Sequence, residues 1–129
     1  MAIKYLVDSN IFLEILLAQA KAEKCKSFLQ EHRGSLYISD FSLHSVGVVV
    51  FRENKPSLFE KFLNDSLPQL TILTLSSQRY FTLLSFREQF QLDFDDSYQC
   101  SIAGEFGLTI ATMDQDYSKV KEQQPIFFV

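Results

Sequence analysis

The sequence predicts an α/β fold, a three-layer sandwich in which helices flank a mostly parallel sheet of four to five strands. Two observations support this prediction. Short apolar segments alternate with helical segments along all 129 residues, an order typical of parallel strands joined by right-handed crossovers. Acidic residues also follow two apolar segments directly, at Asp8 and Asp114, where parallel sheets gather their ligands. A chain of this length is expected to form one domain over residues 1–129.

The first half of the chain is expected to begin with a buried strand. Residues 2–7 are rich in Ile, Tyr, Leu and Val, as parallel strands usually are. Apolar side chains recur with helical spacing over 11–17, and Ser9 or Asn10 is the expected N-cap. The next predicted elements are a helix over 20–32, a strand over 36–38, a helix from 39–42 to about 53, and a helix near 57–66.

The second half is expected to continue the alternation. Residues 70–75 combine Leu with β-branched residues, which predicts a strand, and Ser76 or Ser77 is the expected cap of the helix that follows, to about residue 90. Asp95 or Asp96 is the expected cap of the next helix. That helix is expected to end before Gly107. The remaining predicted elements are a strand over 108–112, a short helix over 114–119 and an edge strand over 125–129.

Composition narrows the possible functions. A net charge of −4 and a pI near 5.1 argue against a broad basic surface for nucleic acid. They do not exclude a nuclease, because bound divalent cations offset the charge of an acidic site. Cys25 and Cys100 form no C-x-x-C pattern and are expected to be reduced packing residues. The apolar start is too short for a signal peptide or a membrane span, so a cytoplasmic location is expected.

The chain holds 13 Phe and no Trp. We interpret four of them, Phe81, Phe86, Phe90 and Phe94, as core or interface residues rather than platforms for stacking bases.

The acidic residues that follow apolar segments predict a metal site. Asp8 and Asp114 are expected at one edge of the sheet, and the cluster of Asp93, Asp95 and Asp96 opens another apolar segment. Hard carboxylate oxygens suit Mg²⁺, which usually takes one or two of them together with water and substrate phosphate. Such a site needs no His or Cys nucleophile. Each aspartate taken alone is also a good helix cap.

Three segments resemble the PIN domain in the form found in VapC-type toxins. They are Val7-Asp-Ser-Asn-Ile-Phe-Leu13, Phe94-Asp-Asp-Ser-Tyr-Gln-Cys-Ser-Ile-Ala103 and Gly107-Leu-Thr-Ile-Ala-Thr-Met-Asp-Gln-Asp-Tyr117. The segments occur in the family's order, and the resemblance covers essentially the whole chain. It implies a PIN-like sheet between helices and a ribonuclease that uses Mg²⁺ or Mn²⁺ to hydrolyse RNA phosphodiesters.

The resemblance also implies residue roles. Asp8, Asp96 and Asp114 match the family's first, third and fourth acids and would be catalytic metal ligands. Asp96 is preferred over Asp95 because it lies seven positions before Ala103, as in the family pattern D-A-x-I-A-A-x-A. Two further similarities concern supporting residues: Asp116 matches the last acid of the ending T-x-D-x-D-F and would help hold metal, and Asn10 and Thr112 would assist by hydrogen bonding.

One family position departs from the pattern. The family's second acid is a Glu in S-x-x-T-L-A-E-L, and aligning that pattern with this chain puts Ser45 there. Asp40 is the alternative acid that could reach the metal instead, whereas Glu53 lies roughly 12 Å farther along the helix than Ser45. Three carboxylates remain chemically competent for one ion, with reduced or altered activity.

Two other α/β protein classes also place an Asp after the first strand, and this sequence lacks residues that each of them needs. A haloacid-dehalogenase-like phosphatase needs Asp-x-Asp after the first strand, but this chain has Asn10 at the second position. A response-regulator receiver needs an acidic pair there and a late Lys, where this chain has Asp114. The stronger alternative is a catalytically silent PIN-like module that binds protein or RNA. The toxin interpretation implies three partners: an RNA substrate, a cognate antitoxin with a basic segment, and a second copy in a homodimer.

Overall fold

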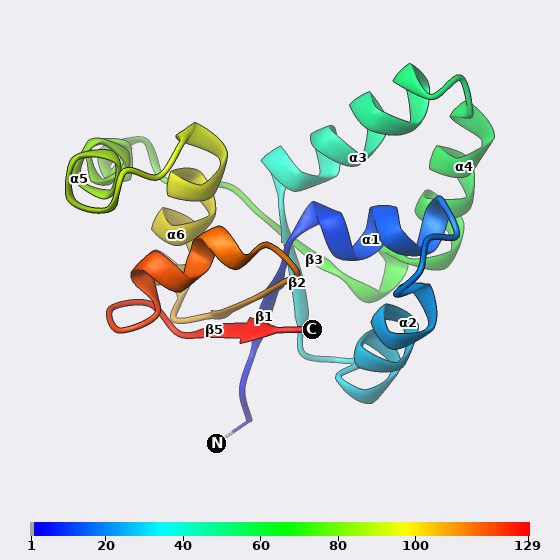
Figure 1. The fold of residues 1–129 in the computed structure, drawn as a ribbon, viewed down its shortest axis with the longest axis horizontal. Helices are drawn as coiled ribbons and strands as arrows, with labels where there is room; N and C mark the ends of the chain where they lie inside the picture. Colours follow the sequence, from blue (N-terminus) through cyan, green and yellow to red (C-terminus); the bar gives the residue numbers. More distant parts are fainter. Residues whose placement is uncertain (1) are drawn as a thin grey trace.

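The computed structural model describes residues 2–129, which form one parallel sheet with helices on both faces. The strand order is β3-β2-β1-β4-β5, so the first strand lies at the centre (Figure 1). All four strand pairs are parallel, which confirms the predicted α/β class. The strands are β1 (Tyr5–Val7), β2 (Leu36–Ser39), β3 (Thr71–Leu73), β4 (Thr109–Thr112) and β5 (Ile126–Phe128).

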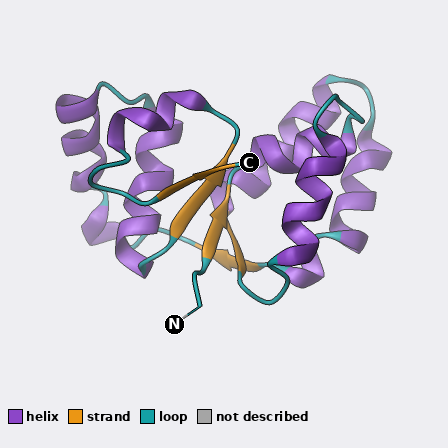
Figure 2. Ribbon diagram, turned by 60° about the horizontal axis from the view of Figure 1, so that its bottom comes forward, coloured by secondary structure: helices purple, strands orange, loops and turns teal. Residues whose placement is uncertain are grey.

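The helices divide into two groups, one on each side of the sheet (Figure 2). Four α-helices form one group: α1 (Ser9–Leu16), α2 (Ala22–Glu31), α3 (Asp40–Arg52) and α4 (Pro56–Asp65). The other group holds α5 (Phe81–Phe90), α6 (Phe94–Phe106) and the 3-10 helix η3 (Gln115–Val120). Two short 3-10 turns, η1 (Leu67–Gln69) and η2 (Ser77–Arg79), flank β3. Within residues 2–129, every helix is too short or too polar to cross a membrane.

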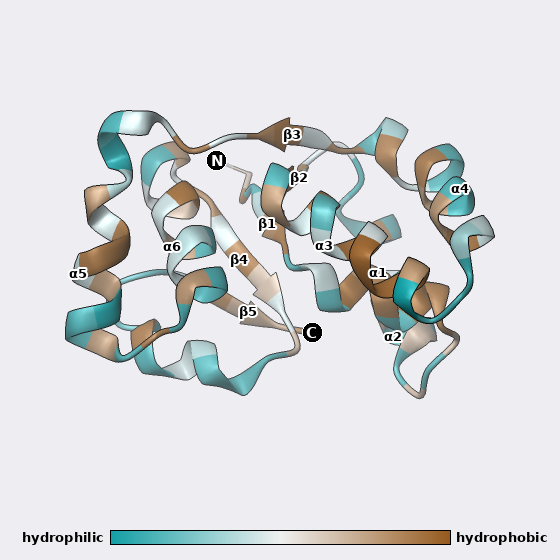
Figure 3. Ribbon diagram, turned by 90° about the horizontal axis from the view of Figure 1, so that it is seen from above, coloured by the Kyte–Doolittle hydropathy of each residue, from teal (hydrophilic) through white to brown (hydrophobic). Residues whose placement is uncertain are grey.

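Two apolar cores lie on the two faces of the sheet. Along β1, Leu6 packs into one core and Val7 into the other, because successive strand side chains point to opposite faces. Val7 packs with Phe12 and Phe62 under α1 and α4, whereas Leu6 packs with Ile110 under α6. Apolar colouring follows β1, β4 and α1 in Figure 3. Both sheet faces are therefore buried, which explains why the strands lack apolar–polar alternation.

Several predicted element ends are wrong by a few residues. The expected strand over 70–75 is reduced to Thr71–Leu73 at the sheet edge, and the helix expected after Ser76 is a 3-10 turn followed by α5. The N-cap of α1 is Asp8, not Ser9 or Asn10. The N-cap of α6 is Asp93, not Asp95 or Asp96. In both cases the observed cap has the extended backbone that a cap requires, one or more residues earlier than expected.

The expected packing residues have mixed outcomes. Cys25 and Cys100 are buried and unbridged in the described chain, as predicted. Phe86 and Phe90 are partly buried against the core under α5 and α6. Phe81 and Phe94 are not core residues, because their exposed fractions are 78% and 56%.

Candidate metal centre

Asp8 joins the end of β1 to the start of α1. Its backbone is extended, and its Oδ1 accepts a hydrogen bond of 2.8 Å from the backbone N–H of Ser9. Its Oδ2 accepts from the Thr112 hydroxyl at 2.8 Å and from Asn10 Nδ2 at 3.2 Å. Asp8 is therefore both a helix cap and part of a network that reaches the neighbouring strand.

Thr112 and Asn10 tie the ends of β1 and β4 together. Thr112 ends β4, and its Oγ1 accepts the backbone N–H of Asp114 at 2.9 Å while it donates to Asp8. Asn10 Oδ1 accepts the backbone N–H of Met113 at 3.3 Å, and its Nδ2 also lies 3.2 Å from Thr112 Oγ1. Because β1 and β4 pair in parallel, this network holds Asp8 and Asp114 at one edge of the sheet.

Asp96, in the first turn of α6, is the third acid at this edge. Asp93 caps that helix by accepting the backbone N–H of Asp96 at 3.2 Å. Asp114 caps η3 by accepting the backbone N–H of Asp116 at 2.9 Å. Carboxylate oxygens of Asp96, Asp114 and Asp116 all lie within 4.8 Å of one another. The caps of α6 and η3 therefore place Asp96 close to Asp114 and Asp116.

Asp8, Asp96 and Asp114 line a polar cavity of about 160 Å³. Its walls come from the carboxyl ends of β1 and β4 and from the starts of α1, α3 and α6. The lining residues are Asp8, Ser9, Asn10, Phe41, Ser42, Ser45, Asp95, Asp96, Gln99, Asp114 and Tyr117. We call this space the acidic cavity.

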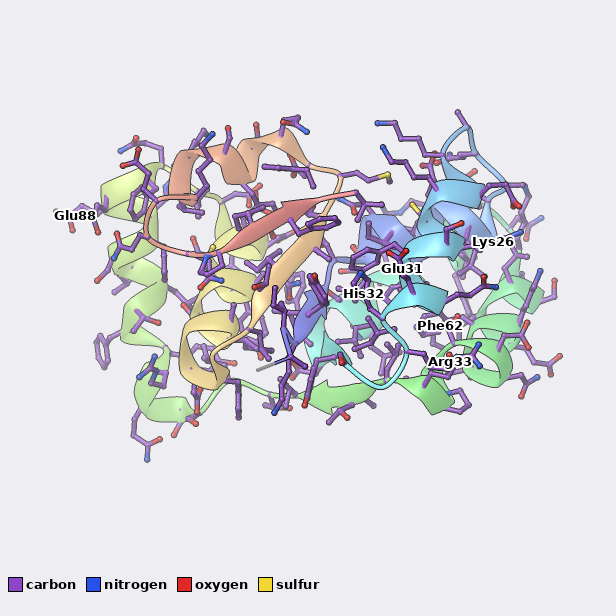
Figure 4. The ribbon with its side chains drawn as sticks, turned by 90° about the horizontal axis from the view of Figure 1, so that it is seen from below. Lys26, Glu31, His32, Arg33, Phe62 and Glu88 are labelled. Atoms are coloured by element: carbon purple, nitrogen blue, oxygen red, sulfur yellow. The ribbon has the colours of Figure 1, made fainter. Side chains whose placement is uncertain are left out.

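Larger hollows lie elsewhere among residues 2–129, and none of them gathers several carboxylates. One of about 310 Å³ lies between α1, α2 and α4, with Lys26 and Arg33 among its lining residues. Figure 4 shows Lys26, Arg33 and Phe62 on that side of the molecule, away from Glu88 on α5. The candidate site is therefore identified by its converging carboxylates and not by the volume of its cavity.

Burial raises the pKa values of two acids in the cavity. The pKa of Asp8 rises to about 6, mainly through desolvation, although the hydrogen bonds from Thr112 and Ser9 lower it. The pKa of Asp96 rises to about 7, through desolvation first and then through the negative charge of Asp93. Carboxylates with raised pKa values are poorly neutralised by the protein alone, and a bound cation would favour their charged forms.

The departure at the second acid lies in this same cavity. Ser45 lines the acidic cavity from α3, so the position where the family pattern has Glu faces the other acids. Asp40 turns to a different set of partners. Its Oδ1 accepts the backbone N–H of Phe41 and the Tyr98 hydroxyl, both at 2.8 Å.

Gln99 and Tyr117 line the cavity and were not predicted from the sequence. Both side chains are buried, with exposed fractions of 2% and 0%. Gln99 follows Asp96 by three residues, so helical spacing alone places the two on one face of α6. Gln99 could have been predicted from that spacing, together with its polar side chain where the pattern D-A-x-I has an apolar residue.

The donor set fits a small, hard divalent cation. Asp96, Asp114 and Asp116 supply three converging carboxylates, and Asp8 supplies a fourth to the cavity lining. Oxygen-only ligands favour Mg²⁺ or Mn²⁺ over the softer metals that seek His or Cys.

Comparisons with known families and solved structures identify what this chain is similar to. A family model described as PIN domain matches residues 5–123. No curated protein sequence matches the chain.

Similar solved structures share the fold at low sequence identity. VapBC2 from Rickettsia felis, bound to a DNA fragment from its promoter, has a TM-score of 0.81 at 16% identity, and 98% of each chain is covered. DNA-bound VapBC from Salmonella typhimurium has a TM-score of 0.80 at 15% identity, again with 98% of each chain covered. VapC20 from Mycobacterium tuberculosis, a toxin that cleaves the sarcin-ricin loop, has a TM-score of 0.77 at 12% identity, covering 95% of this chain and 100% of its own.

Proposed function

The chain belongs to the PIN-domain family, and on that basis we propose that it is a divalent-metal-dependent endoribonuclease, the toxin of a toxin–antitoxin pair. Residues 1–129 act as one PIN-like domain. The observation that carries this proposal is the convergence of the Asp96, Asp114 and Asp116 carboxylates within 4.8 Å, beside a cavity that Asp8, Asp96 and Asp114 line together.

Each acid has a proposed role. Asp8, Asp96 and Asp114 are the catalytic metal ligands, and Asp116 completes the ligand set. When bound, Mg²⁺ or Mn²⁺ would acidify water and neutralise charge on an RNA phosphate. Thr112 and Asn10 hold Asp8 in place through hydrogen bonds to its Oδ2, as outer residues do in metal sites. Asp40 is a weaker candidate for support, since Tyr98 and Phe41 already occupy its Oδ1.

The proposed partners follow from the toxin assignment. Similar structures are described as toxin–antitoxin complexes, including one from Klebsiella pneumoniae. We propose a cognate antitoxin whose basic segment complements the acidic cavity, a homodimer in the free state, and action in the cytoplasm. Exposed Phe81 and Phe94 are candidate contacts for the homodimer.

A silent PIN-like module is the second candidate function. Ser45 favours it, because this residue faces the cavity where the family pattern has its second acid. A site with fewer carboxylates attracts a divalent ion less strongly. The two functions differ in whether metal binding leads to RNA cleavage.

Cleavage of a mixed structured RNA by purified, antitoxin-free protein tests the proposal. We expect cutting in Mg²⁺ or Mn²⁺, loss of cutting in EDTA, and a drop of more than about 100-fold in Asp96→Asn, because removing a ligand should exceed the usual effect of removing a ligand's outer partner. Asp65→Asn, an exposed change on α4, is the matched control.

The outcomes separate the two candidate functions. Cutting that is equal in wild type and Asp96→Asn comes from a contaminant and contradicts the proposal. Folded protein that binds Mg²⁺ without cutting RNA supports the silent module.

A further inference from the structure

One wall of the acidic cavity is neutral. Asp8, Asp96 and Asp114 contribute negative charge, whereas Ser42 and Ser45 from α3 and Gln99 from α6 contribute only neutral polar groups. A phosphodiester that binds a metal through one oxygen still has a second anionic oxygen. That oxygen is repelled by carboxylates and needs a hydrogen-bond donor.

Gln99 presents such a donor. Its Oε1 accepts the Ser39 hydroxyl at 2.5 Å, and Ser39 Oγ in turn accepts the backbone N–H of Ser42 at 2.9 Å as the cap of α3. These bonds orient the amide, because in the opposite orientation the Ser39 hydroxyl would lose its acceptor. The remaining group is Nε2, which has no hydrogen-bond partner among residues 2–129.

A buried N–H group without an acceptor indicates that a ligand supplies the acceptor. Gln99 is 2% exposed, so bulk water does not compensate its amide. Buried polar groups without a partner are rare in folded proteins and lose the hydrogen bond that water gave them. Gln99 lines the acidic cavity, and its Nε2 has almost no accessible surface, so an acceptor that enters the cavity can supply the missing bond after a small shift of the cavity wall.

Among the species that the cavity would take, a phosphate is the best acceptor for this amide. A bare divalent cation repels an N–H group, while a phosphodiester oxygen is anionic and accepts a strong, charge-assisted bond.

We propose that Gln99 is a substrate-binding residue whose Nε2 donates a hydrogen bond to a non-bridging phosphate oxygen of the RNA, one helical turn along α6 from the proposed metal ligand Asp96. This inference rests on the nuclease function proposed above. Gln99 binds substrate in the neutral wall that contains Ser45.

The test follows the Gln99 side-chain amide by NMR. Through-bond spectra link its two amide protons to the Gln99 backbone, and Gln99→Leu confirms the assignment by their loss. Ca²⁺ is added first, followed by a short mixed-sequence RNA, and a gel verifies that the RNA stays intact. We expect Ca²⁺ alone to shift backbone signals of Asp96 and Asp114, and RNA to shift the Gln99 amide protons.

Variants provide a second measurement. We expect Gln99→Leu to weaken RNA binding about tenfold while Ca²⁺ affinity stays within about twofold. Gln89→Leu, the same change at an exposed position of α5, should leave both affinities unchanged. Gln99→Met replaces Gln99→Leu if the latter fails to fold, and the wild-type titration needs neither variant.

Contrary outcomes are distinguishable. If RNA shifts the backbone signals of Asp96 and Ser45 but not the Gln99 amide, the role of Gln99 is wrong and the nuclease proposal stands. A complete shift with Ca²⁺ alone has the same meaning, because the amide then binds a metal-bound water. Protein that binds neither ion nor RNA overturns the proposed function and this inference together.

Discussion

The two halves of the acidic cavity are organised differently. The strand half, formed by Asp8, Asn10, Thr112 and Asp114, is joined by hydrogen bonds of 2.8–3.3 Å between residues as far as 104 positions apart. The helix half, formed by Ser45, Asp96 and Gln99, contains a buried amide nitrogen that lacks a partner within the described chain.

The two halves differ in whether their hydrogen bonds are already formed in the free protein. In the strand half, each oxygen of Asp8 already accepts a hydrogen bond, so its geometry is set before any ion arrives. The helix half leaves hydrogen-bonding capacity open, which folding alone does not satisfy. Changes that break the hydrogen bonds of the strand half should therefore alter stability, whereas changes at Ser45 and Gln99 in the helix half should alter binding.

The largest expected effect is a pH dependence of stability that comes from Asp8. Its pKa is raised from 3.8 to about 6 in the fold, so the folded state disfavours its charged form. This contribution leaves stability highest below about pH 4 and lowers it as pH rises to about 6. The loss amounts to about 3 kcal/mol for a shift of about two pKa units.

Urea denaturation in EDTA between about pH 3.5 and 7.5 measures this effect. Asp8→Asn should remove the part of the decline below about pH 6, and saturating Mg²⁺ should flatten the decline in wild type, since the ion favours the charged carboxylate. Asp96, with its pKa raised to about 7, extends the decline upward in pH, and its partial exposure to solvent reduces its contribution. An identical pH profile for wild type and Asp8→Asn would contradict the prediction.

The next effect tests the hydrogen bonds of the strand half. Thr112→Val removes a fully buried hydroxyl that donates to Asp8 and accepts from the backbone of Asp114. We expect the free energy of unfolding to fall by about 2 kcal/mol, because two partly buried groups each lose a hydrogen bond. Thr109→Val, at the other end of β4, is the control, and equal losses for both variants in urea denaturation would sink the prediction.

A smaller effect tests the helix half. Ser45→Glu adds a carboxylate to the cavity, and we expect Mg²⁺ to bind about tenfold more tightly, a gain of about 1.4 kcal/mol. Ser45→Gln has the same size without the charge and should leave Mg²⁺ affinity unchanged. Isothermal titration measures both variants, and no gain from Ser45→Glu would mean that residue 45 does not reach the ion.

The smallest effect concerns Tyr117. Its hydroxyl is buried, and burial followed by the charges of Asp8 and Asp96 raises its pKa, while the hydroxyl interacts with the Asp96 carboxylate and lowers the pKa of that group. Tyr117→Phe should therefore leave the free energy of unfolding within about 1 kcal/mol of wild type in urea denaturation, because the lost interaction with Asp96 offsets the removal of a buried hydroxyl. Mg²⁺ affinity should not change. A fall in that affinity would show that the hydroxyl orients a metal ligand.

Local sequence signals were sufficient for much of the fold. Apolar segments followed by Asp8 and Asp114 predicted two parallel strands with acids at their carboxyl ends, because strand burial and turn chemistry depend on neighbours within a few residues. The exact caps were less predictable. Asp93, Asp95 and Asp96 are all good caps, and only the backbone conformation selects Asp93.

Residue order alone was therefore enough for the α/β class, the order of the elements and the candidate acids. Tertiary structure decided which polar groups meet. Thr112 reaches Asp8 only because β4 pairs with β1, and Gln99 meets Ser39 across 60 residues only because α6 packs beside the end of β2. Such contacts depend on the packing of distant elements, and no short-range pattern reports whether a buried amide finds a partner or faces a cavity.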